Sequence, residues 1–308
     1  MWCVADDCGT GIFRTALPAF IALREFEWIG YPEMRTDMVQ AVLASHPHLE
    51  SLGLMYEHSP IFFPYLLINN LSRGWHFDAV GVSAFRNLRK FTLRAEDDDG
   101  YADMGEVRTV LDQNSPGLRH LCLGAYLKRD HSWDSAFQSI TIKNLTHLDL
   151  VDTRISHVVF ARIAHAHNLQ SLTLHGTFEE PGKAGVIFGS DHVDVIDGQH
   201  TFLPHLEAFR FVLVGHDDEL ELFQAVTQFL RGRKRLRRLD LGNCPWELVC
   251  SVLVELVGLR VLRVRIANFG ETALRELVRA IPEEMAAIHL ATVVSDKSLV
   301  SKLIIIIA

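Results

Sequence analysis

The stretch Asn144-Leu145-Thr146-His147-Leu148-Asp149-Leu150 decides the fold, because its pattern, Leu-x-x-Leu-x-Leu, returns along the whole chain. Four other regular copies begin at Leu49, Leu118, Leu169 and Leu236. Looser copies begin at Leu23, Leu88, Leu206, Leu259 and Met285. A short strand that cannot bury its apolar face alone must stack on its neighbours, so the copies predict a repeat architecture.

The spacing of the copies indicates the kind of repeat. Successive copies begin 23 to 39 residues apart, and most intervals lie in or near the roughly 20–29 residues of leucine-rich repeats. Between copies the apolar period changes from 2 to 3.6, which predicts helices around Val39, Val159, Val226, Val252 and Leu277. The expected fold class is α/β, a leucine-rich-repeat solenoid of about ten repeats. A curved parallel β-sheet lines its concave side, with helices and irregular segments on the convex side.

We expect residues 1–308 to form a single solenoid. Irregular inserts are expected at about 55–87, which holds Pro60 and Pro64, at 94–105, which is acidic, and at 175–205, which is rich in Gly, Asp and His. Both ends look abrupt, because the first copy has no polar capping unit and Leu303–Ile307 would leave an apolar edge. We therefore interpret the chain as a candidate fragment of a longer gene product.

Composition limits the setting of the protein. Apolar residues make up 48% of the chain, and the formal charge of −8 gives no global reason to expect nucleic acid or a membrane as a partner. Five scattered cysteines suit a reducing compartment. The first residues carry acids and no apolar signal-peptide core. We therefore expect a cytoplasmic or nuclear protein.

The sequence offers no catalytic or metal-binding pattern. Despite sixteen histidines it holds no His-Glu-x-x-His motif and no cysteine pairs at zinc spacing. Asp191, Asp194 and Asp197 are three apart instead of the two that an EF-hand requires, and Phe202 stands where its glutamate belongs. We expect no enzyme activity, no cofactor and no metal.

One basic run, from Arg231 to Arg238, has two interpretations. It resembles a nucleic-acid patch or a nuclear-import signal. The interpretation we favour is a helix end near Gly232 that leads into a strand, because Leu236 and Leu239 interrupt the run as core residues.

The residues between the motif leucines are expected to face the open concave side, because side chains alternate along a strand. The predicted contact residues on this face are Arg210, Arg238, Asp240, Arg263, Arg265, His147, Asp149 and His175. Arg210, Asp240 and Arg263 should form an alternating ladder across neighbouring strands. Asp240 could simply neutralise its neighbours, but Arg238 and Arg265 would then remain unpaired. We predict a protein partner that presents an acidic or phosphorylated segment.

The strand motifs and variable repeat lengths resemble the repeat region of fungal F-box/leucine-rich-repeat proteins. The copy from Leu236 to Cys244 carries the cysteine typical of one repeat subtype, whereas Thr153 and Thr177 hold that position elsewhere. The resemblance implies a substrate receptor of a cullin-based ubiquitin ligase, in which an F-box docks a Skp-family adaptor.

No F-box is visible before the first repeat, so a Skp-family partner is expected only if an F-box is encoded upstream. The first hypothesis is therefore a non-enzymatic protein-interaction scaffold of F-box type lacking its F-box. The alternative is a leucine-rich-repeat domain of another regulatory protein, such as a GTPase regulator or an innate-immune-type sensor.

Overall fold

The computed structural model divides the chain into two compact units, residues 1–154 (unit 1) and residues 155–308 (unit 2). It describes residues 11, 15–29, 36–56, 76–77, 82–95, 101–102, 104–125, 133–134, 136–164, 166–189, 202–214, 219–266 and 270–292.

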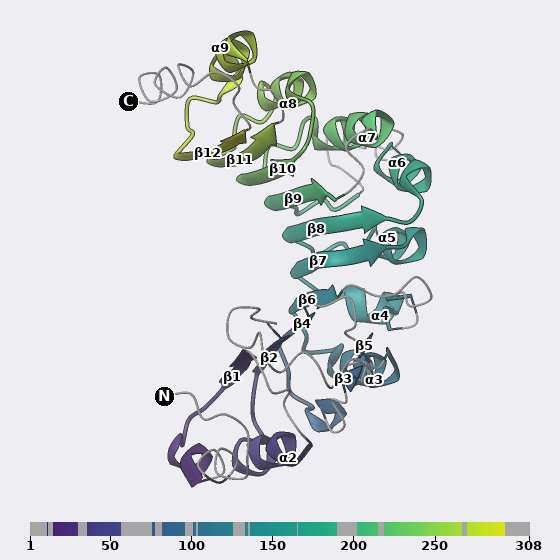
Figure 1. Cartoon of the computed structure of the whole chain (residues 1–308), viewed down its shortest axis with the longest axis vertical. Coiled ribbons are helices and arrows are strands. Elements are labelled where there is room, and N and C mark those ends of the chain that lie inside the picture. Colours follow the sequence, from purple (N-terminus) through teal and green to yellow (C-terminus); the bar gives the residue numbers. More distant parts are fainter. Residues whose placement is uncertain are drawn as a thin grey trace, which may run out of the picture. The chain divides into compact units, whose positions relative to one another are not determined.

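Unit 1 is built around parallel strands in the order β1-β2-β4-β6-β7 (Figure 1). The strands are β1 (Glu25–Ile29), β2 (Ser51–Tyr56), β4 (Lys90–Ala95), β6 (His120–Ala125) and β7 (His147–Ile155). The helical elements are η1 (Leu17–Ala19), α2 (Thr36–Ser45), η2 (Val82–Ala84), α3 (Met104–Asn114) and α4 (Ser139–Ile142). Two short strands, β3 (His76–Phe77) and β5 (Tyr101–Ala102), pair separately.

Unit 2 repeats the same plan with parallel strands in the order β8-β9-β10-β11-β12. The strands are β8 (Ser171–Phe178), β9 (Ala208–Leu213), β10 (Arg238–Gly242), β11 (Val261–Ile266) and β12 (Ala287–Thr292). The helices are α5 (His157–Ile163), α6 (Pro181–Gly189), α7 (Leu220–Leu230), α8 (Trp246–Leu253) and α9 (Glu271–Ala280). Helices cover one face of the strands (Figure 1). The predicted leucine-rich-repeat class is therefore confirmed.

Neighbouring strands pair with equivalent motif positions side by side. Leu121 lies opposite Leu148 in unit 1, and Leu239 lies opposite Leu262 in unit 2. A backbone link fixes this register at the start of β2, β4, β6 and β7 in unit 1 and of β9, β10, β11 and β12 in unit 2. The amide groups of Arg237 and Arg238, for example, both donate to the carbonyl oxygen of Glu207, at 2.7 and 3.0 Å. The same two-donor link joins the other paired strands within each unit. In unit 1, for example, the amides of Glu50 and Ser51 donate to the carbonyl oxygen of Arg24, and in unit 2 those of Ala286 and Ala287 donate to that of Arg260.

The helices predicted around Val39, Val159, Val226, Val252 and Leu277 are all present, as α2, α5, α7, α8 and α9. Each of these residues is buried, so the 3.6-residue apolar period marked the side of each helix that packs on the sheet. Helix α7 ends at Leu230, and Gly232 follows with a φ of 71°, which agrees with the predicted helix end.

The segment 175–205, expected to be irregular, is regular in part. Strand β8 continues to Phe178, and α6 follows over Pro181–Gly189. The ring of Phe188 in α6 lies 4.6 to 6.3 Å from the rings of Phe160, Phe202, Phe209, Phe211 and Phe229, measured between centroids. This aromatic cluster holds a helix that its glycines disfavour. Most of the segment 55–87, half of the segment 94–105, and Asp191 to Asp197 lie outside the described residues.

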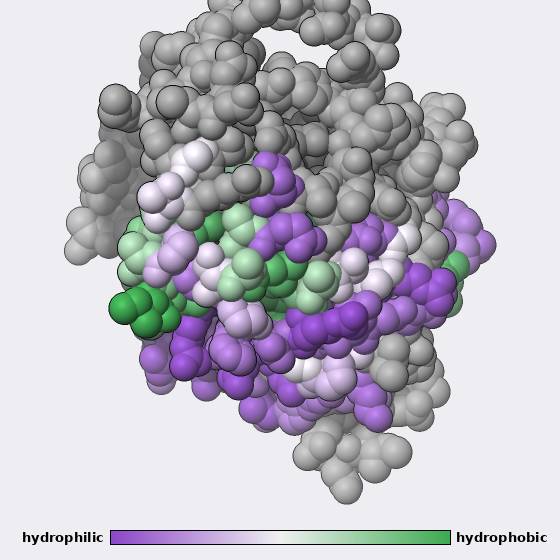
Figure 2. Space-filling model, turned by 90° about the horizontal axis from the view of Figure 1, so that it is seen from below, coloured by the Kyte–Doolittle hydropathy of each residue, from purple (hydrophilic) through white to green (hydrophobic). Residues whose placement is uncertain are grey.

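Strand β1 is less covered than the strands that follow it. Its apolar positions Phe26 and Trp28 are half-buried, whereas the equivalent Leu52 and Leu54 in β2 are fully buried. Figure 2 views the molecule from the end at which β1 and α2 lie, and it shows apolar surface bordered by hydrophilic side chains.

Every helix among the described residues is too short or too polar to cross a membrane.

Replacement of one motif leucine should test the register in each unit. Leu148 and Leu172 are fully buried, so Leu148→Ala or Leu172→Ala should lower the free energy of unfolding by about 2–5 kcal/mol. Denaturant unfolding followed by circular dichroism measures this loss. Val254→Ala, at a largely exposed position, is the control and should change it by less than about 0.5 kcal/mol. A loss below about 1 kcal/mol at either leucine would contradict the register.

Candidate interaction surface

The face of each sheet opposite the helices, the outward face, carries the residues between the motif leucines. In unit 2, β9, β10 and β11 place Arg210, Arg238, Asp240, Arg263 and Arg265 there, and we call this group the arginine face. Their side chains alternate with the buried Phe209, Phe211, Leu239, Leu241, Leu262 and Val264. The alternation of apolar and polar residues in the sequence thus predicted that these residues lie on one face.

The predicted ladder is present in the arginine face. Asp240 pairs in register with Arg210 of β9 and with Arg263 of β11. Its Oδ2 atom lies 3.1 Å from Nε of Arg210 and 3.9 Å from Nη1 of Arg263. The carboxylate is therefore shared by two guanidinium groups, and it is the most buried of the three, with 20% of its side chain exposed.

Arg238 and Arg265 flank the ladder without an ion pair among the described residues. Their strand neighbours are small or apolar: Ala208 and Val261 beside Arg238, and Gly242 and Ala291 beside Arg265. A Cβ atom on Gly242 would lie 2.7 Å from a Val212 side-chain carbon, so that position is already filled from the neighbouring strand. The two exposed arginines therefore lie beside small or apolar residues of the neighbouring strands.

His175, also predicted as a contact residue, lies half-buried on the outward face of β8, opposite Val212. His147 and Asp149 lie on β7 in unit 1. The structure therefore brings the five residues of the arginine face together on β9 to β11 and places the other three on β8 and β7.

In unit 1, the sequence did not single out the ring of His120 as a partner for His147. The two rings stack with centroids 4.0 Å apart and an interplanar angle of 12°. Burial and, secondarily, the charges of His147 and Lys90 lower the pKa of His120. Its ordinary value is near 6.5, so the lowered pKa favours the neutral form of His120 at pH 7.

Three cysteines of the described part are free thiols, and none has the properties of a nucleophile. Burial, followed by the nearby Asp149 carboxylate, raises the pKa of Cys122 to about 11. Burial likewise raises the pKa of Cys250 to about 11 and that of Cys244 to about 12. These thiols are protonated at neutral pH, whereas nucleophiles and metal ligands require the thiolate. Among the described residues, no group of three or more His, Cys, Asp or Glu side chains is placed to hold a metal ion.

Most of the basic run serves folding contacts. Arg233 is buried, with donations to the carbonyl oxygens of Phe229, Leu203 and Phe202 at 2.7, 2.9 and 2.7 Å. Its guanidinium carbon also lies 3.8 Å from the centre of the Phe229 ring. Arg237 donates to the carbonyl oxygen of Gly258 at 2.7 Å. These contacts favour the structural interpretation of the run.

Arg231 and Arg235 of the same run form ion pairs with carboxylates. Arg231 lies 3.8 Å from Glu255, and Arg235 lies 3.7 Å from Glu207. Such exposed pairs contribute at most about 1 kcal/mol each. Arg238 is the member of the run that belongs to the arginine face.

No family model matches the chain, and no curated protein matches it. Among solved structures, an internalin (inlF) from Listeria monocytogenes aligns with 94% of this chain and 86% of its own at 15% identity and a TM-score of 0.41. The structure of a TLR13–ssRNA13 complex aligns with 85% of this chain at 15% identity and a TM-score of 0.35. This chain covers 39% of that second chain.

Replacement of Arg233 tests whether this residue of the basic run stabilises the fold. Arg233→Met removes the side-chain donor to the carbonyl groups of Phe229, Leu203 and Phe202, of which Leu203 still accepts from the Leu206 amide, so the free energy of unfolding should fall by about 2–4 kcal/mol. Lys234→Met, at an exposed neighbour, is the control and should change it by less than about 0.5 kcal/mol. Equal stability of the two variants in denaturant unfolding would show that Arg233 is not a structural residue.

Proposed function

We propose that this chain is a non-enzymatic protein-interaction scaffold whose arginine face binds an acidic or phosphorylated segment of a protein partner. One observation carries the proposal. The outward positions of β9, β10 and β11 hold four arginines and a single carboxylate, Asp240, within a chain of net charge −8. Positive charge is thus concentrated on a face that no helix covers.

Folding does not require this concentration. Arg238 and Arg265 are exposed and form no ion pair with the described residues, so no ion pair of theirs stabilises the fold. Guanidinium groups suit bidentate contact with carboxylates and phosphates. The strand neighbours of Arg238 and Arg265 are small or apolar, and an extended segment of the partner would cover them. His147, Asp149 and His175 belong to the proposal as contact residues on the outward faces of their own units.

A double charge reversal tests the arginine face. Arg238→Glu with Arg263→Glu should abolish the capture of specific partners from lysate, because acidic segments would meet a negative surface. Neither side chain packs in the core, so the melting temperature should stay within a few degrees of the wild type. Captured proteins are identified by mass spectrometry and compared between the two forms.

The matched control is Arg275→Glu with Arg279→Glu on the exposed side of α9, which changes the net charge equally. It should leave capture unchanged.

Phosphatase treatment of the lysate then separates phosphorylated from acidic partners. If the variant of the arginine face still captures the same proteins as the wild type, binding lies elsewhere, for example on the 175–205 segment.

The finer proposal is a substrate receptor of F-box type, with a Skp-family adaptor as a partner only if an F-box is encoded upstream. The strand motifs and the Leu236–Cys244 copy support it. The gene sequence immediately upstream tests it. A coding segment for an F-box is expected, whereas a nucleotide-binding domain at that place would favour an innate-immune-type sensor.

A further inference from the structure

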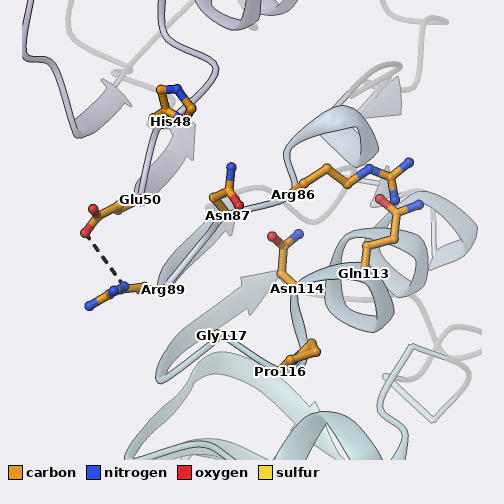
Figure 3. Close-up of a pocket in the computed structure, with 9 residues that line it drawn as sticks. All are labelled: His48, Glu50, Arg86, Asn87, Arg89, Gln113, Asn114, Pro116 and Gly117. Atoms are coloured by element: carbon orange, nitrogen blue, oxygen red, sulfur yellow. Dashed lines mark ion pairs between the residues drawn. The ribbon is translucent and has the colours of Figure 1, made fainter.

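A second candidate site lies in unit 1, at the loops that lead into β2, β4 and β6. A pocket of about 470 Å³ is lined by His48, Glu50, Arg86, Asn87, Arg89, Gln113, Asn114, Pro116 and Gly117 (Figure 3). These residues come from the amino ends of three successive strands and from the end of α3. The pocket is therefore separate from the outward face and from the arginine face of unit 2.

Hydrogen bonds within the protein fix two residues of the pocket lining, Asn114 and Asn87. The Asn114 side chain accepts a hydrogen bond from the Leu88 amide at 2.9 Å and donates to the carbonyl oxygens of Phe85 and Val110, both at 2.8 Å. The amide of Asn87 donates to the carbonyl oxygen of Pro47 at 3.4 Å. These bonds tie neighbouring loops together, so the loops themselves would need little rearrangement on binding.

Among the described residues, one cation of the pocket lining forms no ion pair. Glu50 forms ion pairs with Arg24 and with Arg89, the latter at 3.8 Å (Figure 3). Its carboxylate is therefore shared between two guanidinium groups. No ion pair involves Arg86 within the part of the chain that the structure describes. The pocket thus presents a guanidinium group that is available to an anion.

The lining also holds an acceptor without a donor. The Oε1 atom of Gln113 is buried, and it has no hydrogen-bond partner among the described residues. A buried oxygen without a donor costs about 1–3 kcal/mol. Less than 1 Å² of Oε1 is exposed, so a ligand N–H group would recover this cost once the Gln113 side chain turns the oxygen into the pocket. In Figure 3 the Arg86 and Gln113 side chains extend toward one another.

We propose that this pocket binds a terminal carboxylate together with the adjacent N–H group, as found at the end of a peptide chain or in a free amino acid. The carboxylate pairs with Arg86, and the N–H group donates to Oε1 of Gln113. An isolated anion would satisfy only the first of these groups. A chain end satisfies both, because it carries the acid and the donor on one residue.

Titration of the full chain with three small probes, followed by NMR, tests this binding. The probes are acetyl-trialanine with a free carboxylate, the same peptide with an amidated C-terminus, and free alanine. The acid should bind at least about tenfold more tightly than the amide, since a charged hydrogen bond is lost. Binding of the peptide acid alone identifies a chain end as the source, and equal binding of alanine identifies a free amino acid. Equal affinity for acid and amide, or no binding of any probe, overturns the proposal.

Variants then assign the two contacts. Arg86→Gln should weaken binding of the acid by about tenfold, and Gln113→Met by about fivefold. Both should melt like the wild type, since Arg86 is exposed and the Gln113 acceptor has no described partner to lose. Arg108→Gln, on α3 but outside the pocket, is the matched control and should bind normally.

The double reversal of the arginine face should also leave probe binding unchanged, so failure here is distinct from failure of the proposed function. Full probe binding by Arg86→Gln, or a large loss of binding in the Arg108→Gln control, would refute the assignment of the carboxylate to Arg86.

Discussion

Burial of the motif leucines by pairing in register is the constraint on which the remaining features depend. A single strand of this chain has one apolar side that only its neighbours and the helix behind it can cover, so equivalent positions must align. The alignment of Leu121 with Leu148, and of Leu239 with Leu262, places buried rows on the helical side. The same alignment necessarily lines up the intervening residues on the other side. The Arg210–Asp240–Arg263 ladder is thus a consequence of core packing, although it contributes little to stability itself.

Buried polar groups in the loops complement the backbone links at the strand starts. Asn114 in unit 1 and Arg233 in unit 2 both precede a strand and both bond to carbonyl groups of the preceding loop. Such groups are stabilising only while each donor and acceptor is satisfied. They therefore fix how one loop sits on the next, and in unit 1 the same arrangement shapes the pocket beside Arg86 and Gln113.

The sequence predicted the ten strands that carry the leucine motif, five of the helices and the residues of the arginine face, because periods of 2 and 3.6 report directly which side of an element is buried. It did not predict the short strands β3 and β5. It did not predict α6, whose Gly182 and Gly185 disfavour a helix that the packing of Phe188 stabilises. It also did not predict the roles of Arg233 or Gln113. Their surroundings come from loops distant in the sequence, and a single chain gives no periodic signal for such contacts.

The two-donor backbone link between successive paired strands also limits how the length of the chain can vary over evolution. Insertion of one residue within a strand would move its leucines to the solvent and its arginines into the core, because side chains alternate. Insertions between the end of one strand and the next link leave the alignment intact, as the intervals of 23 to 39 residues illustrate. Duplication or loss of a whole repeat would also preserve every link. In genes of this kind, tolerated changes in length should therefore fall in the connecting segments or comprise entire repeats.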